Sequence, residues 1–187
     1  MTVDGKAGYN TLTKLNDLSP DSVTEFYGRE LTHSEWTAGY SNPLINSVES
    51  LARTIYGEDT TNSDGQAALA KELYNRKNST RSFGDYAKTN PKTWTGIVFS
   101  PTQYAVATGS SLDTENARHP NQYSSQWVNC AALAQSLVNG NVPSSTLANQ
   151  CYHGNKTSIY PPTSIASTRI QIPATVGNKF YDYQTTL

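Results

Sequence analysis

The sequence predicts a predominantly α-helical α+β fold with a small β element near the C-terminus. Apolar residues recur at helical spacing over 44–56 and over 127–138, which predicts two core-facing helices. The segment 168–172 (TRIQI) alternates in polarity, as a half-buried strand does. Because 187 residues can bury one core, we expect a main domain over 41–187, preceded by a lead-in over 1–40.

The helix over 44–56 is expected to place an acidic residue at its carboxyl end. Ser41 or Asn42 is the expected N-terminal cap. Gly57 is expected to close the helix in a left-handed conformation, as glycine often does. Glu58 follows directly and therefore faces the negative end of the helix dipole, which favours a protonated carboxyl group.

A second helix is expected over 63–76. Ser63 and Gln66 have the Ser-x-x-Gln spacing of a capping box, in which each side chain satisfies a free backbone donor of the other residue. Small residues such as Ala67 and Ala70 allow close packing against another helix. We therefore expect the two helices to pack together around the segment that contains Glu58.

Three further helices and a long loop are expected in the rest of the chain. Short helices are expected over 20–31 and 82–88, and a long loop over 89–122. A further helix, capped by Ser125, is expected to end at Asn139-Gly140.

The composition argues against several classes of partner. The chain has 14 Lys and Arg against 15 Asp and Glu, a net charge of -1, so neither nucleic acid nor an anionic membrane surface is expected to bind. No apolar stretch approaches the roughly 20 residues that span a bilayer, and membrane insertion is not expected. Twelve Tyr and three Trp suit a carbohydrate surface, because aromatic faces cover sugar C–H groups. We expect a monomer.

Several kinds of chemistry lack their sequence motifs. There is no Gly-x-Ser-x-Gly elbow, phosphate-binding loop or His-Glu-x-x-His. His33, His119 and His153 share no ligand-like spacing, so neither a metal nor a cofactor is expected. Cys130 and Cys151 are the only cysteines, and the sequence leaves open whether they form a disulfide or two separate thiols. Carboxylate chemistry at Glu58 remains the best candidate, because a protonated Glu can act as a general acid. The alternative is that Glu58 is an ordinary surface residue, followed by Asp59 in a polar loop.

Three motifs around Glu58 resemble a known family. The segments 50–58 (SLARTIYGE), 65–70 (GQAALA) and 74–76 (YNR) match, in order and in spacing, the opening signature of the SleB/CwlJ-type cell-wall hydrolases.

The resemblance continues more loosely over the rest of 48–183. Phe83 corresponds to the family's short Phe-Pro segment, and 99–104 is similar to its aromatic and Gln loop. The segment 130–140 resembles its Ala-rich helix. The segment 176–180 resembles the closing Ile-Gly-x-His-x-Phe, with Lys in the place of the His.

The resemblance implies a lysozyme-like, lytic-transglycosylase-like domain that cleaves the glycan strand of peptidoglycan, with Glu58 as the catalytic acid. It implies action at the bacterial cell wall, whether extracellular, periplasmic, spore or phage-associated, with an export route that the chain does not explain. The segment 4–11 (DGKAGYNT) similarly resembles the end of a peptidoglycan-binding repeat.

Six further residues are candidate substrate contacts. Gln66 either binds a sugar or caps its helix, and Asn75 follows the apolar stripe of the same helix. Gln103 and Tyr104 lie in the aromatic loop, and the weaker candidates are Tyr152 and His153.

The reaction itself is left open. A transglycosylase needs one carboxyl group and forms a 1,6-anhydro ring, whereas a muramidase-type hydrolase uses water, and Asp85 or Asp113 could then face Glu58. A catalytically silent peptidoglycan-binding module is a third possibility. An amidase is disfavoured because no metal motif or nucleophile pair is evident.

Overall fold

We describe a computed structural model of the chain, which covers residues 28–42, 45–88, 92–109, 112–147, 149–155, 166–171 and 178–183. The fragment that resembles a peptidoglycan-binding repeat lies outside these residues, as does most of the helix expected over 20–31. Residues 28–31 are not helical.

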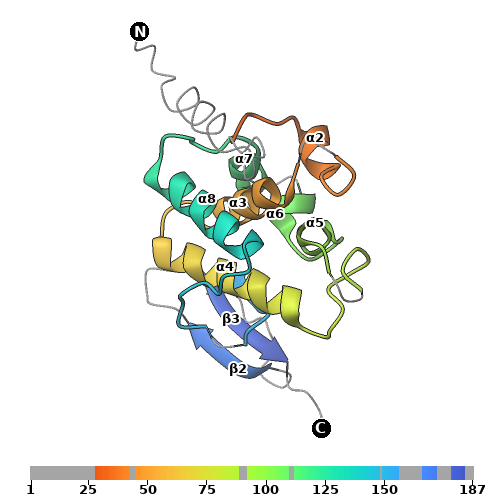
Figure 1. Cartoon of the computed structure of the whole chain (residues 1–187), viewed down its shortest axis with the longest axis vertical. Coiled ribbons are helices and arrows are strands. Elements are labelled where there is room, and N and C mark those ends of the chain that lie inside the picture. Colours follow the sequence, from red (N-terminus) through yellow and green to blue (C-terminus); the bar gives the residue numbers. More distant parts are fainter. Residues whose placement is uncertain are drawn as a thin grey trace, which may run out of the picture.

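The described residues form a predominantly helical structure (Figure 1). Its helices are α2 (His33–Thr37), α3 (Ser47–Glu58), α4 (Ser63–Asn78), α5 (Trp94–Phe99), α6 (Ala105–Thr108), α7 (Leu112–Arg118) and α8 (Ser125–Val138).

Helix α3 lies at the centre and contacts α4, α5, α6, α7 and α8. Its side chains are buried almost all round, from Val48 to Gly57, rather than along a single face as the sequence suggests. Its hydroxyl groups are satisfied within the helix, where Thr54 Oγ1 donates to the Ser50 carbonyl at 2.8 Å. Polar residues can therefore occupy a buried helix without losing hydrogen bonds.

The ends of α3 differ from the expected ones. Asn46, not Ser41 or Asn42, caps the helix, and its side chain accepts a hydrogen bond from Glu49 N. Gly57 is an ordinary helical residue, and the helix ends at Asp59, whose backbone is extended. Glu58 is the last residue of α3, whereas the sequence predicts a position just beyond the end of the helix.

The turn from α3 to α4 is held by two short polar side chains. Asp59 Oδ1 accepts from the backbone N–H groups of Thr61 and Asn62. Asn62 then caps α4 by accepting from Asp64 N and Gly65 N, so the capping box expected at Ser63 does not form. The turn fixes the direction in which α4 leaves the end of α3.

Two expectations for the middle of the chain are wrong. Residues 82–88 are a turn rather than a helix: Gly84 has a φ of +86°, and Phe83 N donates to the Ala87 carbonyl. The expected loop over 89–122 contains α5, α6 and α7 instead. Each is shorter than the window over which helical periodicity can be recognised.

The C-terminal region forms a small antiparallel sheet. Its strands are β1 (Tyr152–Asn155), β2 (Ala166–Gln171) and β3 (Asn178–Tyr183), with β3 in the centre. Strand β2 coincides with the strand expected over 168–172 up to Gln171. Figure 1 shows α4 crossing the molecule between the other helices and this sheet, which places α4 beside both.

Residues 28–40 pack on the same core as the helices that follow. Trp36 is completely buried, and its Nε1 donates to the Val106 carbonyl at 2.8 Å. The buried Arg53 guanidinium donates to the carbonyls of Arg29 and Ala117. One side chain of α3 therefore ties both this segment and α7 to the core.

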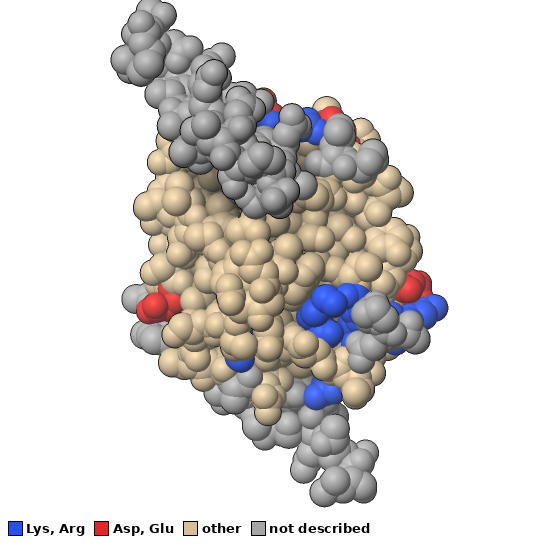
Figure 2. All heavy atoms as spheres, in the orientation of Figure 1, with Lys and Arg blue, Asp and Glu red and all other residues tan. Residues whose placement is uncertain are grey.

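The face of the molecule drawn in Figure 2 is mostly uncharged. Lys and Arg side chains gather on one side of that face, near the C-terminal end of α4 as seen in Figure 1. None of the described helices is long and apolar enough to cross a membrane.

Cys130 and Cys151 are both buried and are not joined to each other, which answers the question that the sequence left open.

Candidate functional site

The site is built around Glu58, at the junction of α3 and α4. The Glu58 side chain is 15% exposed, so it reaches the surface of an otherwise buried region. The backbone behind it is held by Gln66, whose Nε2 donates to the Asp59 carbonyl at 2.9 Å. Gln66 Oε1 accepts from Asn129 Nδ2 at 2.7 Å. Gln66 therefore links the end of α3 to α8.

His153 connects Glu58 to a second, buried carboxylate. Its Nε2 lies 3.2 Å from Glu58 Oε2, and its Nδ1 lies 2.7 Å from Glu72 Oε2. Each nitrogen of the imidazole thus faces a different glutamate. Strand β1 supplies the histidine, and α3 and α4 supply the two carboxylates. Two side-chain contacts thus link three residues that are far apart in sequence.

Glu72 has no exposed surface and is satisfied on all sides. Tyr104 donates its phenolic hydrogen to Glu72 Oε1 at 3.0 Å, and Arg76 Nη2 lies 2.8 Å from the same oxygen. Together with the His153 contact, both carboxylate oxygens are occupied. A buried carboxylate is tolerated only with such partners, so Glu72, Arg76, Tyr104 and His153 form an interdependent cluster.

Arg76 fixes the walls of the cluster. Its Nε donates to the Cys151 carbonyl at 2.7 Å, and its Nη1 donates to Gln103 Oε1 at 3.2 Å. The guanidinium lies over three aromatic rings, those of Phe83, Tyr104 and Tyr152, with ring centres 4.5 to 5.3 Å away. Arg76 thereby holds the start of the sheet and the loop before α6 against α4.

The charges of the cluster follow from its geometry. Burial alone lowers the pKa of His153, but the Glu72 and Glu58 carboxylates outweigh burial and raise the pKa from 6.5 to about 10. Burial raises the pKa of Glu72, yet the charges of His153 and Arg76 outweigh it, so the net shift is downward. Burial also raises the pKa of Tyr104 well above its usual value, which keeps the phenol protonated as a donor.

The residues expected to contact substrate have different partners and different degrees of burial in the structure. Tyr104 and His153 contact Glu72, and Tyr104 is buried, which leaves its side chain little surface for a sugar. Gln103 accepts from Arg76, and Asn75 Nδ2 donates to the Gln150 carbonyl at 2.9 Å. Tyr152 is partly buried against the core.

Gln66 is a further case, since it is completely buried and bridges α3 to α8. Its role differs from both readings of the sequence, because it neither caps α4 nor lies exposed to a ligand.

Sequence reasoning missed Glu72 and Phe180. Phe180 pairs with His153 across the sheet, and the two ring centres lie 5.8 Å apart. The signal for Glu72 was present: Glu72 and Arg76 are four residues apart on the face of α4 that carries Leu69 and Leu73. Two opposite charges within an apolar stripe indicate a buried ion pair.

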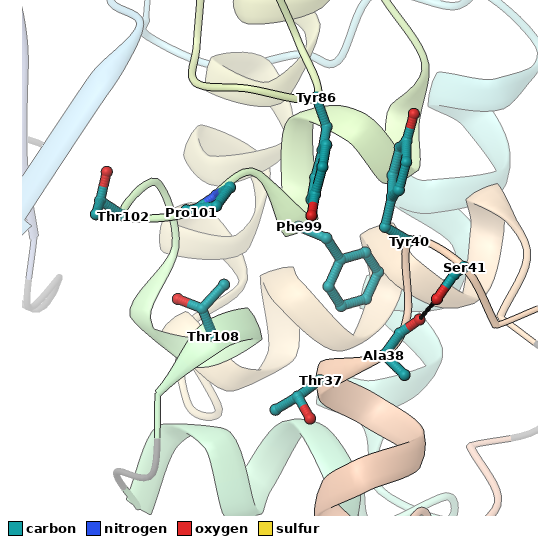
Figure 3. A pocket seen from close by; sticks show the side chains of 9 residues that line it. All are labelled: Thr37, Ala38, Tyr40, Ser41, Tyr86, Phe99, Pro101, Thr102 and Thr108. Carbon is teal, nitrogen blue, oxygen red and sulfur yellow. Dashed lines mark hydrogen bonds between the residues drawn. The ribbon is translucent and has the colours of Figure 1, made fainter.

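The loop before α6 connects this cluster to a surface hollow of about 330 Å³ (Figure 3). Thr102 lines the hollow with a φ of +68°, an uncommon conformation for threonine. The next two residues are Gln103 and Tyr104, which contact Arg76 and Glu72. The Tyr40 and Tyr86 rings stack face to face at 4.1 Å beside the hollow, and both remain partly exposed.

The cluster does not have the arrangement of a metal site. Glu58 and Glu72 lie at opposite nitrogens of His153, so the three side chains do not converge on one point. Nowhere in the described part of the chain are three or more His, Cys, Asp or Glu residues placed to hold a metal ion.

The chain matches no known protein-family model, and no curated protein and no solved structure is significantly similar to it.

Proposed function

We propose that this protein cleaves the glycan strand of peptidoglycan, with Glu58 as general acid and base, and that its fold is lysozyme-like. The observation that carries the proposal is the position of Glu58 at the α3–α4 junction, partly exposed and in contact with a buried, charged cluster. The motifs that resemble the SleB/CwlJ-type hydrolases lie on these two helices. The resemblance and the geometry therefore single out the same carboxyl group.

The favoured reaction is that of a lytic transglycosylase. A proton passes from Glu58 to the oxygen that links C1 of N-acetylmuramic acid to the next sugar, and the C1–O bond breaks. The oxygen of the C6 hydroxyl then bonds to C1, and the Glu58 carboxylate accepts its proton. One residue serves as acid and then as base, and the products are a 1,6-anhydro end and a free hydroxyl.

The positions of Asp59, Glu72 and Asp85 support a reaction with a single acid, while the side chain of Asp113 lies outside the part of the chain that the structure describes. Asp59 is engaged in the turn between α3 and α4, and Glu72 is buried behind His153. Asp85 forms an exposed ion pair with Lys88. A muramidase-type hydrolase, with water in place of the C6 hydroxyl, is the second candidate. Partial exposure of Glu58 supports it, because water can reach that carboxylate.

The hollow beside Thr102 is the proposed binding surface for sugars distant from the cleaved bond. Hydroxyl groups of Thr37, Ser41 and Thr108 line it together with Tyr40 and Tyr86. Hydroxyl groups and aromatic edges suit an uncharged, hydroxyl-rich chain. Thr102 lines the hollow, and Tyr104, two residues later in the chain, contacts Glu72 of the cluster.

Digestion of purified cell wall tests the proposal. Wild-type protein, Glu58→Gln and the exposed control Glu30→Gln are incubated with wall, and the soluble products are analysed by mass spectrometry. We expect 1,6-anhydro muropeptides from the wild type and the control, and none from Glu58→Gln. Reducing ends would identify a hydrolase. Binding without products would identify a silent binding module, and new free amines would refute glycosidic cleavage.

A further inference from the structure

The contact between Glu58 and His153 raises a chemical question that the proposed function leaves open. A general acid must have a proton to give, yet Glu58 lies 3.2 Å from an imidazole that is itself flanked by a second carboxylate. A proton on His153 Nε2 would lie between the imidazole and Glu58 Oε2. The two groups must therefore be considered as one acid, in which a proton is shared.

We propose that His153 is a positioning residue that stores the proton which Glu58 delivers to the glycosidic oxygen, and that Glu72 holds the imidazole in place for this purpose. The inference rests on the proposed function and deepens it. It assigns a role to two residues that the motifs around Glu58 do not include.

The geometry favours storage on the histidine. Glu72 accepts from Nδ1 at 2.7 Å and has no exposed surface, so the imidazole is anchored on the side away from Glu58. Nε2 then points at Glu58 Oε2 and at no other carboxylate among the described residues. The orientation of the ring is further limited by Tyr104 and Phe180, whose ring centres both lie 5.8 Å from that of His153.

The charged groups around His153 support the same conclusion. Glu58 faces it from α3, Glu72 and Arg76 lie on α4, and the neutral Tyr104 precedes α6. Phe180 faces it from β3 and has no charge. The two carboxylates raise the pKa of His153 to about 10 in spite of its burial. The imidazole is therefore positively charged throughout the neutral range.

The proton moves in a closed cycle. The Nε2 proton passes to Glu58 Oε2, and Glu58 then gives this proton to the leaving oxygen as the C1–O bond breaks. The C6 hydroxyl then forms the new bond to C1 and returns a proton to Glu58 and, through it, to Nε2. Neither an oxidant nor a further reactant is needed, and the Glu58–His153 pair ends with the charge with which it began.

Two variants and one control test this role kinetically. In His153→Gln and Glu72→Gln we expect kcat for release of muropeptides to fall by about 100-fold, the lower range of acid–base contributions, with KM within about twofold. We expect the alkaline limb of the pH profile to move to lower pH in His153→Gln, because Glu58 alone must then retain the proton. His119→Gln changes an exposed histidine paired with Glu115 and should leave rate and profile unchanged.

Nuclear magnetic resonance of the imidazole nitrogens provides a readout that does not depend on activity or on a folded variant. In the wild-type protein we expect His153 to remain protonated at both nitrogens at neutral pH. A neutral imidazole there would overturn the proposal. So would a His153→Gln enzyme with wild-type rate and pH profile.

If the proposed function itself were wrong, the digestion experiment would give a different result from the one that contradicts the role of His153. In that case the wild-type protein would release no glycan fragments, or Glu58→Gln would remain active, whatever the state of His153.

Discussion

The Glu72 carboxylate lies 2.7 Å from Nδ1 of His153, on the opposite side of the imidazole from Glu58. The buried carboxylate therefore acts on the partly exposed one through a single ring. Glu72 also accepts from Tyr104 and Arg76. Its charge is compensated by two cations, His153 and Arg76, and its position is fixed by three partners. The same buried carboxylate therefore stabilises the fold and holds the imidazole that contacts Glu58.

Replacement of Glu72 by Gln is expected to destabilise the fold as well as to reduce activity. Arg76 would remain buried without its carboxylate, and an uncompensated buried charge costs about 3 to 5 kcal/mol. Denaturant unfolding measures this free energy. Asp85→Asn removes a carboxylate from an exposed pair and should change it by less than about 1 kcal/mol. An equal, small effect of both substitutions would contradict the role assigned to Glu72.

The sequence alone was sufficient to predict the helical core and the place of Glu58. Apolar spacing and a polar turn were enough to put Glu58 at the end of α3, although the reason differs, because Asp59 rather than Gly57 ends the helix. The error had little consequence for the site, since both endings put Glu58 at the carboxyl end of α3.

The contacts of Glu58 could not be predicted in the same way. His153 and Glu72 are 81 residues apart in sequence, and only the packing of the sheet beside α4 brings them together. Local sequence patterns do not predict a contact between residues so far apart in the chain. The capping box at Ser63 does not form for a related reason: Asn62 caps α4, and Gln66 bonds instead to Asp59 and to Asn129, which lies on α8.

The stability of the protein should depend on pH through His153. Its pKa is about 10 in the folded protein and 6.5 as the ordinary value, so folding favours the protonated form. The resulting stabilisation is complete below about pH 6.5 and is lost as the pH rises to about 10. We expect the difference in unfolding free energy between wild type and His153→Phe to shrink over this range. A difference that is constant, or that grows with pH, would contradict a protonated His153.

Breaking the buried pair of Glu49 and Arg53 should destabilise the helical core. Arg53 has no exposed surface, and its guanidinium also donates to the carbonyls of Arg29 and Ala117. Arg53→Met leaves Glu49 buried without its cation and should cost about 3 to 5 kcal/mol in denaturant unfolding.

A double-mutant cycle separates this pair from simple loss of packing. In the variant that combines Arg53→Met with Glu49→Gln, we expect a smaller cost than the sum of the single changes, because no unpaired charge remains. Strict additivity would show that the two residues act independently. Lys88→Met, at an exposed pair, is the matched control and should cost less than about 1 kcal/mol.

The hollow beside Thr102 should affect substrate binding rather than the chemical step. Tyr86→Ala removes one of the two stacked rings and leaves the Glu58 cluster in place. Loss of one aromatic contact with a sugar, worth on the order of 1 kcal/mol, should raise KM for soluble glycan fragments about fivefold and leave kcat unchanged. Tyr123→Ala removes an exposed tyrosine that does not line the hollow and serves as the control. A fall in kcat with constant KM would instead indicate that Tyr86 supports the catalytic cluster, and an unchanged enzyme would show that the glycan does not reach this hollow.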